Sequence, residues 1–371
     1  MDFALDGTAI AVRDVADDVF ARHQPDWEST FGAAGSDAPR FDTELWRALV
    51  DAGLLALPLP AEFDGDDVGV LGLLPLLRRM GESAAVTPAL GTLTAALVFA
   101  AADTNPWQRW PEALIGGRWA AIALGEPGDA LTATPHTTVR GGRCSGTKVG
   151  VLHADGASVL LVGTDAGVAV ISADADGVSI TPTTSSSGWG ESTVVFDDVA
   201  LDDADIVTRD LSVLRDRYRL ALCAYADGLI AGATRLTADH VSTREQFGKP
   251  IALFQAVGQQ LADIYVIGRS LDLAVTSAGW RLDEGLSAAD DLAIGMYWIA
   301  DEVPATMRTM THLHGGVGVD ITYPLHRYFS IAKDLARLAG GATQRLDELA
   351  DVRDLATHES DDTAEDAADV H

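Results

Sequence analysis

The sequence predicts an α+β protein in which a helical first part precedes a β-rich middle part and a terminal bundle of long helices. In the first and last parts, apolar residues recur close to the helical period. In the middle part they form short runs separated by Gly, Asp and Thr, which is typical of strands and turns. The 371 residues, 47% of them hydrophobic, are enough for two or three domains with sizeable cores.

These changes of period divide the chain into four predicted parts. We expect an N-terminal α-helical domain at 1–118, a middle β-barrel or sandwich domain at 119–205, a C-terminal four-helix bundle at 206–357 and an acidic disordered tail at 358–371. The tail is rich in Asp and Glu and poor in large apolar residues, so it has little surface to bury.

The helical domain is predicted to contain at least three helices. Apolar residues at helical spacing predict a helix over 41–50 that ends near Gly53. A loop rich in Pro and Gly follows at 54–66. Further helices are expected over 71–81 and 90–101.

The middle domain is predicted to be a small antiparallel barrel or sandwich, because its strand-like runs are short and the turns between them are tight. The expected strands cover 121–124, 149–152, 157–162, 168–171 and 192–196.

The last domain is predicted to be a four-helix bundle, because four long helical segments follow one another with short links. They cover 207–240, 251–282, 288–313 and 324–355. Between the first two, Gly248 and Pro250 interrupt the helical pattern, which predicts a helix–turn–helix corner with Arg244 at its shoulder. A plain hairpin between two helices would show much the same local pattern.

Composition argues against several classes of function. The net charge of −29 argues against nucleic acid, whose phosphates need a basic surface. No apolar run reaches membrane-spanning length, and the acidic N-terminus lacks the basic start of a targeting peptide, so we expect a cytoplasmic protein without membrane contact. The two cysteines, Cys144 and Cys223, make no disulfide framework or zinc site and are expected to be buried hydrophobes.

A second motif begins at His312 and His314 and continues into Gly315-Gly316-Val317-Gly318. Two histidines at i and i+2 suggest a metal, but no third ligand stands at a supporting spacing, so no metal is expected. The glycines do not follow a strand, which excludes the phosphate loop of a dinucleotide-binding fold. The local pattern alone indicates a helix end that needs positive φ.

These motifs resemble the acyl-CoA dehydrogenase family. The family's corner between the first two bundle helices has the pattern Arg-x-x-Phe-Gly followed by Gln, matched here by Arg244, Phe247, Gly248 and Gln255. The run 196–199, Phe-Asp-Asp-Val, resembles the closing strand of the family's middle domain. The helix–strand–helix order matches the family over nearly the whole chain.

The resemblance implies that the corner and the glycine loop contact the adenosine diphosphate half of an FAD bound by the neighbouring subunit. Guanidinium offers a planar, bidentate match to pyrophosphate oxygens, and glycines let backbone approach without a clashing side chain. His312 stands where the family usually has Gln. The residues expected to contact the cofactor are Arg244, Gln246, Phe247, Phe254, Gln255, His312, Gly315 and Gly316.

The family's catalytic residue is missing from this sequence. The family's reaction removes a proton from the acyl α-carbon with a carboxylate base, almost always Glu, and passes a hydride from the β-carbon to flavin. The two family positions of that Glu correspond to Ala339 and Tyr218. Alanine has no proton acceptor and tyrosine is a poor base at neutral pH, so no catalytic residue is expected.

The motifs that would hold the chain's own flavin are degraded as well. The family's Thr-Glu-Pro-x-x-Gly-Ser-Asp corresponds to 125–132, where the hydroxyl positions have become Gly125 and Leu131. The next family motif, Trp-Ile-Thr/Ser, corresponds to 150–152, which contains no aromatic residue.

Loss of these parts together with retention of the corner resembles one branch of the family, the non-catalytic partner subunit of α2β2 heterotetramers that bacteria use on steroid-CoA side chains. This resemblance implies a homologous catalytic subunit as partner and an FAD shared at the interface. It also implies α,β-dehydrogenation of a bulky steroid-CoA thioester, with a three-carbon side chain in cholesterol degradation.

Two alternatives remain open at the level of sequence. One is a self-sufficient homotetrameric acyl-CoA dehydrogenase with a displaced base, for which Glu126, Asp129 and Glu191 are the nearby carboxylates. The other is a flavin-free scaffold or binding protein that kept the fold for assembly.

Overall fold

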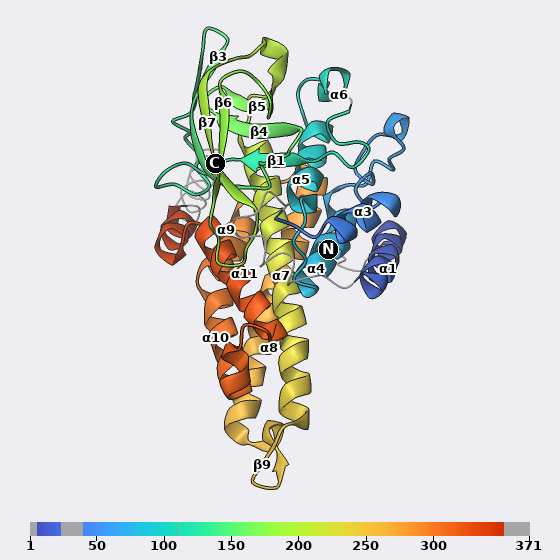
Figure 1. Cartoon of the computed structure of the whole chain (residues 1–371), viewed down its shortest axis with the longest axis vertical. Helices are drawn as coiled ribbons and strands as arrows, with labels where there is room; N and C mark the ends of the chain where they lie inside the picture. Colours follow the sequence, from blue (N-terminus) through green and yellow to red (C-terminus); the bar gives the residue numbers. More distant parts are fainter. Residues whose placement is uncertain (1–5, 24–39, 111, 352–371) are drawn as a thin grey trace, which may run out of the picture.

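The computed structural model describes residues 6–23, 40–110 and 112–351. The predicted acidic tail lies outside the described residues, as does the end of the predicted bundle. Figure 1 shows the elements in three groups: helices from the first third of the chain, a β-rich group at one end, and a long helical bundle that extends away from it. Within the described residues, none of the helices is both long enough and apolar enough to cross a bilayer.

The helices of the first third begin at residues that cap them. Asp6 accepts a hydrogen bond from Ala9 N (2.7 Å), and Asp42 accepts bonds from Glu44 N (3.1 Å) and Leu45 N (2.9 Å). The predicted helices are confirmed with ends shifted by at most two residues. The elements are α1 (Gly7–Arg22), α3 (Thr43–Asp51), η1 (Ala61–Phe63), α4 (Val70–Glu82), α5 (Ala89–Ala100) and α6 (Pro106–Arg109).

The β-rich group consists of two four-stranded sheets, ordered β1-β4-β5-β8 and β2-β3-β7-β6. Their strands are β1 (Ala120–Ala123), β2 (Thr138–Arg140), β3 (Arg143–Leu152), β4 (Val159–Thr164), β5 (Gly167–Ser172), β6 (Val178–Thr183), β7 (Glu191–Ala200) and β8 (Ile206–Thr208). Each predicted run overlaps a strand, whereas β2, β6 and β8 were not predicted.

One feature of the predicted β architecture is wrong. β1 pairs with β4 in parallel, so the group is not purely antiparallel. The chain leaves β1 for β2 and β3 of the other sheet and returns to β4 alongside β1, and such a crossover is what parallel pairing requires.

The bundle contains five described helices rather than four long segments. They are α7 (Ser212–Thr243), α8 (Gln255–Asp283), α9 (Ala289–Ala300), α10 (Glu302–His314) and α11 (Pro324–Leu338). The first begins at Ser212 instead of 207 because residues 206–208 form β8, which pairs with β5 in the sheet β1-β4-β5-β8. The second begins at Gln255 instead of 251, after the 3-10 turn η3 (Ile251–Leu253).

The other two predicted segments are each interrupted. Pro304 has no N–H to donate to the carbonyl of Ala300, and the helix breaks at Asp301 (φ −114°, ψ −59°) between α9 and α10. The last segment ends at Leu338 because Gly340 and Gly341 take φ of +88° and +81°. Residues 342–351 form a separate helix.

Glycines let α7 pass very close to α4. A Cβ on Gly228 would stand 1.9 Å from the carbonyl oxygen of Arg78, and one on Gly81 would stand 2.0 Å from that of Tyr225. This crossing fixes α7 against the N-terminal helices, while its far end continues down the bundle (Figure 1). Two distant regions of the molecule are therefore joined by one helix, which carries Tyr218 near its start and His240 near its end.

Candidate functional site

The corner after α7 forms a tight hairpin at the far end of the bundle (Figure 1). β9 (Glu245–Gln246) pairs with β10 (Lys249–Pro250), and Ile251 N donates to Arg244 O at 2.8 Å. Phe247 and Gly248 in the turn both take positive φ, +54° and +77°. Positive φ at both central residues suits a two-residue hairpin, so the predicted helix–turn–helix corner is more elaborate than expected and contains a short β-ribbon.

The side chains of this corner point outward instead of packing on the bundle. Phe247 is 92% exposed, which is unusual for a large apolar side chain. The rings of Phe247 and Phe254 pack edge to face, with their centres 6.3 Å apart. Lys249 Nζ lies 4.4 Å from the centre of the Phe254 ring. Arg244 is exposed and forms no ion pair with any described residue, so its guanidinium is available to a ligand.

The glycine loop follows α10 as the 3-10 turn η4 (Gly315–Val319). Gly315 has φ +63° and ψ −140°, and a Cβ on Gly315 or Gly316 would meet nothing within 4 Å. The open space beside these glycines leaves their backbone accessible. Val319 and Ile321, just beyond them, are also exposed.

The corner and the loop lie at the same end of the molecule because α7 and α10 meet there. His240 on α7 and His314 on α10 stack with ring centres 4.4 Å apart and planes at 21°. The eight residues predicted to contact a cofactor therefore gather at one end of the bundle. We call this set the tip: Arg244, Gln246, Phe247, Phe254, Gln255, His312, Gly315 and Gly316. All are exposed except Phe254, which is partly buried.

A second region lies at the opposite end of α7. An open cavity of about 600 Å³ runs between the 125–131 loop, β7, the start of α7 and the 337–344 segment, and we call it the cleft. Tyr218 lines the cleft but is buried, and burial raises the pKa of its hydroxyl above the ordinary value. Ala339, the other position at which the family has Glu, is fully buried.

The place of the family's aromatic residue is taken by the end of α11. A Cβ on Gly150 would stand 3.1 Å from Leu338 Cδ2, and the φ of Gly150 is +68°. No aromatic side chain fits there without displacing Leu338. Beside it, Arg337 forms an ion pair with Glu191, whose carboxylate also accepts from Thr183 Oγ1 at 3.3 Å.

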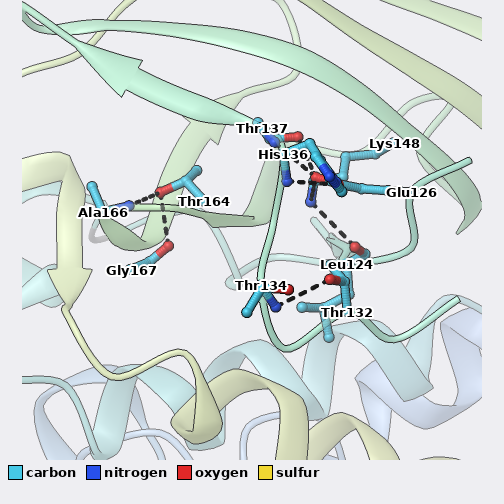
Figure 2. Close-up of polar contacts among 10 residues, drawn as sticks. All are labelled: Leu124, Glu126, Thr132, Thr134, His136, Thr137, Lys148, Thr164, Ala166 and Gly167. Carbon is cyan, nitrogen blue, oxygen red and sulfur yellow. Dashed lines mark hydrogen bonds and ion pairs between the residues drawn. The ribbon is translucent and has the colours of Figure 1, made fainter. Parts of the chain in front are cut away.

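Glu126 lines the cleft, and its carboxylate takes part in a network of hydrogen bonds (Figure 2). Its carboxylate accepts bonds from Lys148 Nζ (2.8 Å), from Thr137 N and Oγ1 (2.9 and 2.7 Å) and from His136 N (2.8 Å). Burial by itself raises the pKa of Glu126, but the bonds from Lys148 and Thr137 outweigh it and hold the pKa at about 2. Such a carboxylate is a poor proton acceptor.

The third carboxylate of the cleft is also hydrogen-bonded. Asp129 accepts a hydrogen bond from Gln344 Nε2 at 2.8 Å. The three carboxylates Glu126, Asp129 and Glu191 are therefore each bonded within the chain. Beyond Tyr218, the space toward Leu90, His153 and Trp189 holds only about 10 Å³, close to the volume of one water molecule and too small for an acyl chain.

Sequence reasoning missed two parts of these regions. The stack of His240 and His314 joins residues 74 positions apart, and the sequence around each histidine gives no indication of the contact. The Lys148–Glu126 pair left a signal in the sequence, because Lys148 is one of three lysines and directly precedes the predicted strand 149–152. The described residues include no cluster of His, Cys, Asp or Glu suited to a metal.

Comparison with known proteins identifies the relatives of this architecture. The family model described as "Acyl-CoA dehydrogenase, C-terminal domain" matches residues 215–350. The chain is 46% identical over 307 residues to "Acyl-CoA dehydrogenase FadE28" of Mycobacterium tuberculosis, which covers 82% of this chain and 91% of that protein. The chain belongs to the acyl-CoA dehydrogenase family.

Two solved structures are similar to this chain in fold as well as in sequence. The ChsE4–ChsE5 complex from Mycobacterium tuberculosis superposes with a TM-score of 0.85 at 32% identity, covering 96% of this chain and 99% of that chain. A variant of the Tcur3481–Tcur3483 steroid ACAD gives 0.84 at 30% identity, with coverage of 94% and 98%. This acyl-CoA dehydrogenase is thus similar in structure to chains from two family members, each of which is named after two different proteins.

The two regions of this acyl-CoA dehydrogenase fit the family's flavin cofactor to different extents. The cleft does not fit a flavin ring: Leu338 fills the aromatic position, the hydroxyl positions are Gly125 and Leu131, and carboxylates predominate over cations. The tip fits one end of such a cofactor, because it offers an uncommitted guanidinium, amide groups and accessible glycine backbone.

Proposed function

We propose that this chain is the non-catalytic subunit of an α2β2 FAD-dependent acyl-CoA dehydrogenase. Its tip contacts the adenosine diphosphate half of an FAD held by a homologous catalytic subunit. When bound, FAD supplies the acceptor for the substrate hydride, while the carboxylate base belongs to the partner. The role of the present chain is to bind and orient the cofactor.

The separation between the tip and the cleft carries this proposal. Tyr218 and Arg244 lie 26 residues apart on one continuous helix, so the rise of α7 puts roughly 39 Å between them. A single FAD cannot use the tip of this chain and the Tyr218 end of the same chain in the usual compact site. The tip therefore serves a cofactor that is bound mainly by another subunit.

The paired carboxylates of the cleft support the assignment of chemistry to the partner. Glu126 is held as a carboxylate by its hydrogen bonds, and Glu191 is neutralised by Arg337. Neither meets the requirement for a general base, which is a free lone pair within reach of substrate at a matched pKa. The self-sufficient enzyme with a displaced base is thus disfavoured.

The relatives support a steroid substrate for this proposal. One similar structure is described as a steroid ACAD, and the pairing of two chains recurs in both similar structures. We infer that the heterotetramer α,β-dehydrogenates a steroid-CoA thioester, with a three-carbon side chain as the specific expectation. With one active site per pair of chains, the site that this chain does not use leaves room for a bulky fused-ring substrate.

The first experiment is co-expression with a homologous catalytic subunit, followed by native mass and flavin absorbance of the purified complex. We expect two copies of each chain and two FAD, which is one FAD per pair. One FAD per chain would contradict the proposal. A yellow, active homotetramer of this chain alone would establish the self-sufficient enzyme, and a complex without any flavin would establish the scaffold.

A further inference from the structure

The stacked pair His240–His314 connects the two motifs that make up the tip. Arg244 N donates to His240 O at 2.9 Å, so His240 lies one helical turn before the corner. His314 is the last residue of α10 and directly precedes Gly315. The 4.4 Å stack is therefore the side-chain contact that joins the end of α7 to the start of the glycine loop.

The ring of His314 is fixed in its position. The side chain is buried, its Nδ1 lies 2.9 Å from Met310 O, and its ring centre is 5.3 Å from that of Tyr323. A carbonyl oxygen only accepts hydrogen bonds, so Nδ1 carries the proton and donates it. In the neutral ring Nε2 is then unprotonated, and a second proton would make the ring cationic.

The surroundings of the pair favour neutral imidazoles. Burial lowers the pKa of His240, and the nearby His314 and Arg244 lower it further. Burial also lowers the pKa of His314, against the opposing effect of the Met310 and Leu236 carbonyls. These groups come from α7 and α10, and Tyr323, which precedes α11, also packs on the His314 ring as a neutral phenol because burial raises its pKa. None of these groups is a carboxylate that would stabilise an imidazolium.

We propose that His240 and His314 are positioning residues that hold the Arg244 corner and the Gly315 loop together while both rings are neutral, and that protonation separates the two. Two imidazolium rings in face-to-face contact repel each other, and Arg244 adds a third positive charge one turn away. The inference rests on the proposed function, because its consequence is release of the shared FAD.

The direction of the pH effect follows from the lowered pKa values. Both rings bind protons less readily when stacked than when separated, so the stacked arrangement is fully favoured above about pH 6.5, the ordinary value for histidine. It is lost as the pH falls below that value. FAD retention should therefore be strong at pH 7.5 and weak at pH 5.5.

The test measures FAD affinity of the co-expressed complex by ultrafiltration and flavin fluorescence from pH 5.5 to 7.5. We expect the wild-type complex to lose more than about threefold in affinity, nearly all of it between pH 6.5 and 5.5, with an upper limit of about tenfold for each linked proton over that unit. The double variant H240F/H314F keeps two stacked aromatic rings but cannot take up protons there. Its affinity should change by less than about twofold.

Two further variants serve as controls. H314A removes the stack and should weaken FAD binding at every pH, whereas H23F changes a histidine at the end of α1 and should keep the wild-type pH profile. An H240F/H314F complex that loses FAD as steeply as wild type overturns the inference.

One more comparison separates this failure from failure of the proposed function. If R244A lowers FAD affinity at pH 7.5 but the wild-type affinity does not depend on pH, the shared-cofactor proposal stands and the positioning role is wrong. If R244A leaves FAD affinity unchanged at pH 7.5, the proposed function itself is wrong.

Discussion

The tip and the cleft lie at opposite ends of α7 and differ in whether their charged side chains are paired. At the tip, Arg244 is exposed and has no ion-pair partner among the described residues. In the cleft, Glu126 and Glu191 are paired with Lys148 and Arg337. An exposed cation without a partner can bind an anionic ligand, whereas buried charged groups that pair with one another mainly stabilise the fold. Under the proposed function, the tip is the part of the family site that this chain uses, and the paired carboxylates of the cleft leave no free base there.

The largest effect should come from breaking the buried pair of Glu126 and Lys148 at the cleft. Lys148 is fully buried, so E126Q would leave an ammonium group without a counter-charge and should lower the free energy of unfolding by about 3–5 kcal/mol. D129N, which changes a partly buried carboxylate of the same loop, should cost less than about 1 kcal/mol. Urea unfolding of the isolated chain measures both.

The pH dependence of stability sharpens this prediction. The folded-state pKa of Glu126 is about 2, below its ordinary 4.5, so its stabilising contribution is present above about pH 4.5 and is lost as the pH falls toward 2. E126Q should lack this part of the acid transition. If E126Q instead abolished activity of the complex without changing stability, Glu126 would be the displaced base after all.

The next effect concerns the tip. R244A should weaken FAD binding by the complex by about 2–3 kcal/mol, roughly 30- to 150-fold, because one charge-assisted, bidentate contact to phosphate is lost. The isolated chain should unfold at the same urea concentration as wild type, since Arg244 is exposed. R244K should retain only part of the affinity, because an ammonium group cannot bind in bidentate fashion.

A smaller effect is expected at Tyr218, the cleft residue at a family base position. Y218F removes one buried hydroxyl and should change stability by about 1 kcal/mol or less. Turnover by the complex should stay within about twofold, because the base belongs to the partner. Steady-state kinetics at pH 7.5 test this, and a loss of a hundredfold or more would assign chemistry to this chain.

The smallest effect on stability is expected at Phe247. F247S should change the free energy of unfolding by less than about 0.5 kcal/mol, since the side chain is 92% exposed. The same change should lower the flavin content of the purified complex if the tip contacts the partner's cofactor. V15S, which alters an exposed apolar residue on α1, is the matched control and should leave flavin content unchanged.

Local sequence predicted most elements but few of their ends. The runs near 71–81 and 90–101 became α4 and α5 because their apolar spacing already specifies a helix. The prediction of a single helix over 288–313 was wrong, because the apolar periodicity continues across the break between α9 and α10. Pro304 was the local signal of that break. The short strand β8 was absorbed into the predicted helix, since three residues carry too little pattern to be recognised.

The sequence by itself determined which residue types stand at the positions matched to the family's motifs. Ala339 and Tyr218 cannot supply a carboxylate in any fold, and Gly150 cannot supply an aromatic ring. Only the tertiary structure decided where the retained groups lie. The contact of His240 with His314, the roughly 39 Å from Tyr218 to Arg244 and the pairing of Glu126 with Lys148 depend on helix length and on close crossings such as Gly81 with α7. Such contacts join residues far apart in the chain, so local sequence patterns cannot predict them.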